Sequence, residues 1–71
     1  MKTLEVDLSV VKNYNANAAV VLAYVNTSDK ALSNTEVANG VGISFPTAQK
    51  VLQTLANDGL IAEVGKLYRK L

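Results

Sequence analysis

The stretch GISFPTAQKVLQTLANDGLI, residues 42–61, has the pattern of one capped amphipathic helix. Ser44 is a favourable N-cap residue, and Pro46 follows in the first turn, where its missing backbone N–H leaves no hydrogen bond unmade. Gly59 stands where a glycine commonly follows a helix C-terminus, because glycine adopts the left-handed conformation without strain. The sequence therefore predicts a helix over residues 44–58.

The two sides of this helix differ in character. With 100° between successive residues, Ala48, Leu52 and Leu55 share one side, so we expect Leu52 and Leu55 in the core. Phe45 lies at the border of that side, and its angle favours the core. The other side is long and polar and carries a single charge; it comprises Thr47, Gln49, Lys50, Gln53 and Thr54. A solvated face is one explanation, although such faces more usually carry Glu and Lys.

An apolar helix is expected further upstream. Residues 18–25 are apolar nearly all round, which predicts a mostly buried helix, and either Asn15 or Asn17 can cap its N-terminus. The segment that follows it, residues 26–34, is rich in side chains that hydrogen-bond to nearby backbone, which predicts a loop.

A short helix is expected between these two. Ser33 or Asn34 can serve as its N-cap, and Glu36 in its first turn suits the positive end of the helix dipole. Gly40 and Gly42 are expected to end it in a tight turn that leads into the capped amphipathic helix.

Two segments have the pattern of β-structure. Leu4, Val6, Leu8 and Val10 alternate with polar residues, which predicts an N-terminal strand or arm within residues 1–12. At the other end, LIAEVGKLYRKL predicts two short strands joined by a type II′ turn at Gly65 and Lys66.

Length and composition limit what the chain can be. Seventy-one residues make one domain, spanning 1–71, that buries only about 60% of the surface of its unfolded chain. The sequence has no Cys and no His, so disulfides, Cys/His zinc sites and catalysis by either residue are excluded. Its carboxylates fall in separate predicted elements, and no glycine-rich phosphate-binding motif is present. We therefore expect no enzyme activity, no cofactor and no metal.

Location and charge give a further expectation. No run of 18 apolar residues exists, and Glu5 and Asp7 interrupt the N-terminus, so neither a membrane span nor a signal peptide is expected. We expect a cytoplasmic protein. Residues 1–43 have three lysines and four acids, whereas residues 44–71 have four basic and two acidic residues, so the positive charge is C-terminal.

The order of these elements resembles a known DNA-binding fold. LSNTEVANGVGISFPTAQKVLQTLANDGLIAEVGKLYRKL, residues 32–71, resembles the winged helix-turn-helix of IclR- and MarR-type transcription regulators. The matching residues are Val37, Ala38, Val41, Ile43, Ser44, Pro46, Thr47, Val51, Leu52, Leu55, Gly59, Leu60 and Ile61. The resemblance implies an α+β fold of three helices and a C-terminal β-hairpin wing, here with an extra N-terminal strand. This 71-residue sequence is too short to include the effector domain that such regulators carry, so no small-molecule effector is expected.

The resemblance also implies sequence-specific binding of double-stranded DNA by a small, nucleoid-associated transcription regulator. Helix 44–58 would enter the major groove, and the 62–70 hairpin would contact flanking backbone. The expected DNA contacts are Ser44, Phe45, Pro46, Thr47, Gln49, Lys50, Gln53, Lys66 and Arg69. For Phe45 two interpretations stay open, since the matching position of the resembling families often faces DNA.

Two alternatives accompany this hypothesis. The weak net charge and the apolar composition favour a winged helix that binds protein, whereas the polar helix and the C-terminal positive charge favour DNA. Lys66 and Arg69 could serve only to keep an exposed strand edge from aggregating, and Tyr68 between them in the hairpin is expected to pack rather than to stack on a base.

We also expect a homodimer, with residues 4–10 or the apolar helix at 18–25 forming its interface, because two-fold symmetry doubles the contact with a palindromic site.

Overall fold

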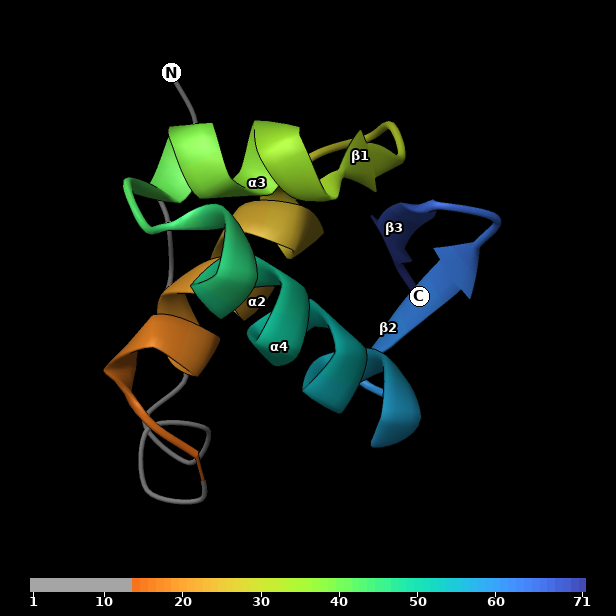
Figure 1. Ribbon diagram of the computed structural model, residues 1–71. Coiled ribbons are helices and arrows are strands. Elements are labelled where there is room, and N and C mark those ends of the chain that lie inside the picture. Colours follow the sequence, from red (N-terminus) through yellow and green to blue (C-terminus); the bar gives the residue numbers. More distant parts are fainter. Residues whose placement is uncertain (1–13) are drawn as a thin grey trace.

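The computed structural model describes residues 14–71, so the predicted N-terminal strand lies outside the described residues. The chain forms three helices and a three-stranded antiparallel sheet within this range. In order they are α2 (Ala16–Thr27), β1 (Leu32–Ser33), α3 (Asn34–Val41), α4 (Phe45–Asn57), β2 (Ile61–Val64) and β3 (Leu67–Lys70). Figure 1 shows the three helices packed together, with the β2–β3 hairpin beyond the C-terminal end of α4. This is the α+β winged helix-turn-helix that the sequence predicts.

Helix α2 forms the base of the core. Asn15 is its N-cap, and the Asn15 side chain accepts a hydrogen bond from the Ala18 N–H at 2.9 Å. The helix extends two residues beyond the predicted 18–25 at each end. Val21 and Val25 are completely buried, which confirms the expected mostly buried helix.

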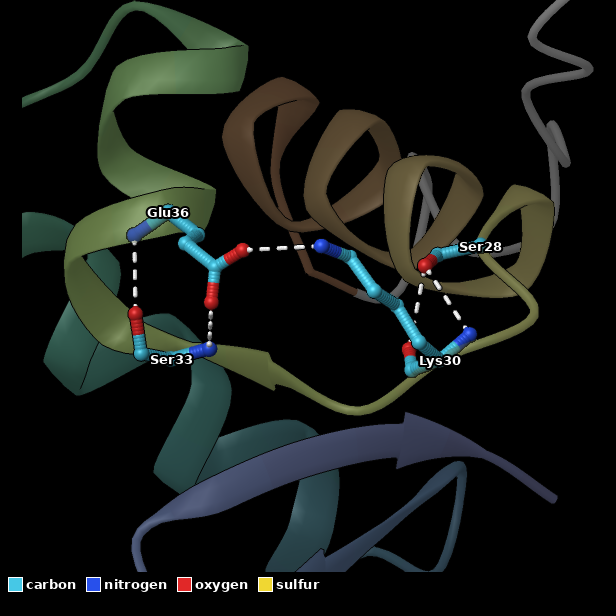
Figure 2. Close-up of polar contacts among 4 residues, drawn as sticks. All are labelled: Ser28, Lys30, Ser33 and Glu36. Carbon is cyan, nitrogen blue, oxygen red and sulfur yellow. Dashed lines mark hydrogen bonds and ion pairs between the residues drawn. The ribbon is translucent and has the colours of Figure 1, made fainter.

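Helix α3 begins with a reciprocal cap. The Ser33 hydroxyl accepts from the Glu36 N–H at 3.1 Å, and the Glu36 carboxylate accepts from the Ser33 N–H at 3.2 Å. Figure 2 shows this pair together with Lys30, whose ammonium lies 3.5 Å from the other Glu36 oxygen. The backbone hydrogen bond from Ser33 lowers the pKa of the Glu36 carboxyl below its ordinary value of 4.5, and the Lys30 charge lowers that pKa further.

The prediction that Gly40 helps to end α3 is wrong. Gly40 lies inside α3, whereas Gly42, with a φ of 85°, is the left-handed C-cap. A Cβ placed on Gly40 would collide with the ring and hydroxyl of Tyr24. The absence of a side chain at Gly40 therefore gives the end of the Tyr24 ring its place against α3, and a larger residue would displace that ring.

Helix α4 is one residue shorter at each end than the predicted 44–58, and Ser44 and Asp58 are its caps. The Ser44 hydroxyl accepts from the Thr47 N–H at 3.3 Å, which makes Ser44 the N-cap. After the C-terminus, Gly59 has a φ of 78°, and the Leu60 N–H donates to the Leu55 carbonyl at 3.0 Å. These are the features of a Schellman motif, so the glycine acts as predicted.

The apolar side of α4 completes the core. Leu52 and Leu55 have no exposed surface, as the helical spacing predicts. They pack with residues of α2, α3 and the sheet in one cluster. The buried members of this cluster are Ala19, Val21, Leu22, Val25, Leu32, Val37, Leu52, Leu55, Ile61 and Tyr68. The predicted packing role of Tyr68 is confirmed.

The sheet has the order β1-β3-β2. Val64 pairs with Leu67 across a two-residue turn, Gly65 has a φ of 63°, and no residue other than glycine in 14–71 has a positive φ. A type I′ turn would require a positive φ at Lys66 as well, so the turn is type II′ as predicted. Strand β1 was not predicted, because its segment was expected to be a loop.

We predict that Leu52→Ala lowers the free energy of unfolding by about 2–5 kcal/mol, because it leaves a cavity in a fully buried site. Urea denaturation followed by far-UV circular dichroism measures this loss. Leu71→Ala is the matched control, since that leucine is 79% exposed and its truncation should change stability by less than about 0.5 kcal/mol. Equal stability of the two variants would show that the faces of α4 are assigned incorrectly.

We also predict that Glu36 makes stability depend on pH. Since its folded-state pKa is lowered, its contribution is present above the ordinary pKa of 4.5 and is lost as the pH falls through the lowered pKa. Urea denaturation of the wild type and of Glu36→Gln at a series of pH values tests this. The Gln variant preserves the capping motif without a titrating group. The stability difference between the two proteins should shrink below pH 4.5, and a constant difference would contradict the assignment.

Candidate nucleic-acid interface

The exposed side of α4 forms a ridge of polar side chains. Pro46, Gln49, Lys50 and Gln53 are all exposed along this helix, as the sequence predicts. Lys50 carries the only charge among them. We call this surface, from Pro46 to Gln53, the α4 ridge.

A groove of about 300 Å³ lies on one side of the ridge, between α4, the start of α3 and the hairpin. We call it the wing-side groove. Its lining residues are Asn34, Phe45, Gln49, Gln53, Glu63, Gly65, Lys66 and Tyr68. Four residues predicted to contact DNA are thus brought together here, although Lys66 is far from the others in sequence.

A second groove, of about 290 Å³, lies on the other side of the ridge, between α4 and the N-terminal end of α2. We call it the α2-side groove. Its lining residues are Tyr14, Asn15, Asn17, Ala18, Thr47, Lys50, Val51 and Thr54. The Tyr14 hydroxyl donates a hydrogen bond to Asp58 at the C-terminus of α4, which ties the start of α2 to the far end of α4 and raises the pKa of Tyr14.

Hydroxyl groups at the start of α4 are already engaged. The Ser44 hydroxyl donates to the Thr47 hydroxyl at 2.8 Å, which leaves the Thr47 hydrogen available for a ligand. Farther along, the Thr54 hydroxyl donates to the Lys50 carbonyl at 2.9 Å. On this side of the ridge, α4 itself therefore offers the Thr47 hydroxyl and the Lys50 ammonium as hydrogen-bond donors.

Lys66 and Arg69, the two hairpin residues predicted to contact DNA, face different directions. Successive side chains of a strand point to opposite faces of a sheet. Tyr68 is buried against the helices, so its neighbours Leu67 and Arg69 point away from them. Lys66, in the turn, lines the wing-side groove, whereas Arg69 lies on the outer face of the hairpin.

Phe45 is not a core residue, contrary to what its helical angle favours. It is 50% exposed and lines the wing-side groove. It is the first residue of α4, and helical side chains tilt toward the N-terminus of their helix. Its ring therefore extends past the packed part of α4, while the small Ala48 takes the fully buried place on the first turns.

A scan against known protein families matched residues 16–65 to the IclR helix-turn-helix domain, which covers α2 through the first residue of the hairpin turn. The chain belongs to the IclR helix-turn-helix family. This is a DNA-binding domain of transcription regulators, and such domains are typically not enzymes. No curated protein and no solved structure matched the chain. Within residues 14–71, no helix of this IclR-type domain combines the length and apolar character needed to cross a membrane.

Sequence reasoning missed two residues of the wing-side groove in this IclR-type domain. Asn34 is the first residue of α3, and its side-chain oxygen is buried with no hydrogen-bond partner among the described residues. Glu63 pairs across the hairpin with Tyr68. Burial raises the pKa of Tyr68, and a hydrogen bond with the Glu63 carboxylate raises it further. Strand alternation could have revealed Glu63, because it shares a sheet face with buried Ile61.

Proposed function

We propose that this IclR-type domain binds a specific sequence of double-stranded DNA and acts in the cytoplasm, at the nucleoid, as a small transcription regulator. The observation that carries the proposal is the α4 ridge, which is polar, nearly uncharged and bounded by a groove on each side. A protein-binding winged helix would not need such a ridge, whereas a DNA reader does.

The shape of this surface matches duplex DNA. The major groove is about 12 Å wide and admits one α-helix, with a phosphate backbone rising on either side. A ridge between two grooves is complementary to this profile. Lys50 reaches the α2-side groove and Lys66 the wing-side groove, so each side of the inserted helix has one cation.

The neutral side chains of the ridge supply base recognition. Gln49 and Gln53 are exposed one helical turn apart, and a glutamine amide can bond to both N6 and N7 of adenine. The exposed ring of Phe45 beside them suits apolar contact with a thymine methyl. Base edges are read by such groups, while charged groups mainly position the protein on the duplex.

The remaining residues that are predicted to contact DNA position the protein on the duplex. Ser44, Pro46 and Thr47 form the N-terminal turn of α4, where the positive end of the helix dipole and the Thr47 hydroxyl favour a phosphate. Lys66 in the hairpin turn contacts a flanking phosphate, and Arg69 contacts one from the outer face of the hairpin.

We predict that two classes of variant differ in their effect on DNA binding. Gln49→Ala or Gln53→Ala should weaken binding to the preferred site by roughly 1–3 kcal/mol and barely change binding to random DNA. Lys66→Ala or Arg69→Ala should weaken both alike and reduce the salt slope by about one for each phosphate that the variant no longer neutralises. Fluorescence anisotropy over a salt series measures both quantities.

A control and a contrary outcome complete this test. Asn39→Ala changes an exposed amide on α3 that lines neither groove, so it should bind DNA like the wild type. If the wild type binds no duplex, or if the glutamine and lysine variants all bind like the wild type, the α4 ridge does not read DNA.

We also propose that the protein acts as a homodimer. A single small DNA-binding module buries only about 600–1,000 Å² on DNA, so a second copy strengthens binding to a palindromic site. Helix α2 offers little to this interface, because six of its apolar residues are buried in its own domain. Residues 4–10 and the exposed side chains of Val64, Leu67 and Leu71 are the better sources of apolar contact.

We predict a dimer mass in sedimentation equilibrium of the full chain at tens of micromolar, a range in which moderate interfaces are populated. Deletion of residues 1–12 should shift the protein toward monomer if that segment forms the interface, whereas Leu67→Asp should do so if the outer sheet face forms it. A monomer with and without duplex DNA would contradict the proposal.

A further inference from the structure

Glu63 is the unexpected group on the DNA-facing surface. Among the residues that line the two grooves beside α4, it is the only carboxylate. A carboxylate repels phosphate, so Glu63 takes no part in the phosphate contact proposed for Lys66 in the same groove. Because a carboxylate accepts hydrogen bonds, Glu63 favours a ligand group that donates hydrogen bonds over a phosphate.

The backbone of Glu63 is held in position. Glu63 lies on β2 directly opposite Tyr68 of β3, and its carboxylate is close enough to the Tyr68 hydroxyl to raise the pKa of that tyrosine. Tyr68 is only 5% exposed and belongs to the hydrophobic core, so its hydroxyl cannot move far. Since β3 is the central strand of the sheet, both neighbours of this strand fix the Tyr68 backbone. The sheet thus fixes the backbone of Glu63 beside the wing-side groove, where its carboxylate is available as a hydrogen-bond acceptor.

The charges of the two grooves differ accordingly. The α2-side groove has Lys50 as its one charged lining residue. The wing-side groove has one cation, Lys66, and one carboxylate, Glu63, together with the amides of Gln49 and Gln53. The first composition suits a phosphate alone, whereas the second adds to the phosphate contact of Lys66 the mixed donors and acceptors that suit a base edge.

We propose that Glu63 is a specificity-determining residue that accepts a hydrogen bond from the N4 amino group of a cytosine in the major groove. This inference rests on the proposed DNA binding by the α4 ridge. It adds that the wing-side groove reads a base pair next to those read by Gln49 and Gln53, and that hairpin strand β2 contributes to sequence recognition.

Cytosine is favoured for a chemical reason. In the major groove it presents an amino donor with no acceptor on the same base, so an acceptor-only carboxylate meets no repulsion there. Adenine places its N7 acceptor beside its amino group, and guanine and thymine present acceptors alone. An amide in place of the carboxylate would instead match adenine, because it both donates and accepts.

The test is selection from a pool of duplexes of randomised sequence. The wild type, Glu63→Gln and Glu36→Gln are each bound to the pool, and the retained DNA is sequenced. Glu36→Gln is the matched control: it makes the same change in net charge, keeps its helix cap and lies outside both grooves. Binding constants are then measured for the wild-type site and for the same site with one C·G pair replaced by A·T.

The wild type and Glu36→Gln should enrich the same site and prefer C·G over A·T at one position by roughly 5- to 150-fold. Glu63→Gln should lose that preference or shift it to adenine, while its preferences at the other positions persist. If Glu63→Gln enriches the wild-type site unchanged, the role of Glu63 is wrong and DNA binding by the ridge stands. If the wild type itself enriches no sequence, the proposed sequence-specific function falls, and the role of Glu63 falls with it.

Discussion

The complete burial of Ala48, Leu52 and Leu55 fixes how α4 is oriented and how the rest of the domain is arranged around it. These three side chains fix the rotation of α4 about its own axis, because turning the helix by one residue would place a polar side chain in the core. With the rotation fixed, the α4 ridge must face outward. The same burial holds α2 and the sheet on opposite flanks of α4, which creates a groove on each side of the ridge.

Local chemistry explains why the helices could be predicted closely from the sequence. Asn15, Ser33 and Ser44 each cap a helix through a side chain that reaches a backbone N–H three residues later. Such caps depend on neighbouring residues alone, as does the two-residue hairpin turn at Gly65. A pattern of local residues is therefore enough to locate them.

The features that the sequence did not reveal depend on contacts between distant residues. Strand β1 exists because Leu32 pairs with Tyr68 at the far end of the chain. The space that Gly40 leaves is filled by Tyr24, which belongs to another helix. Phe45 was expected in the core from its angle, yet no element of the described chain covers the start of α4 at that point. Likewise, the meeting of Glu63 with the α4 ridge becomes visible only when the hairpin is placed beside the helix.

Ser33 has two structural roles at once, and this has a consequence for the cost of binding. As the last residue of β1 it pairs with Leu67 beside the hairpin turn, and as the N-cap it begins α3. The pairing of Ser33 with Leu67 therefore links the hairpin directly to the start of α3. No residue lies between β1 and α3 that could act as a hinge. Association with a ligand loses free energy when flexible segments must become ordered. Because this pairing restricts the hairpin relative to α3, ordering the hairpin on a ligand would cost the domain little conformational entropy.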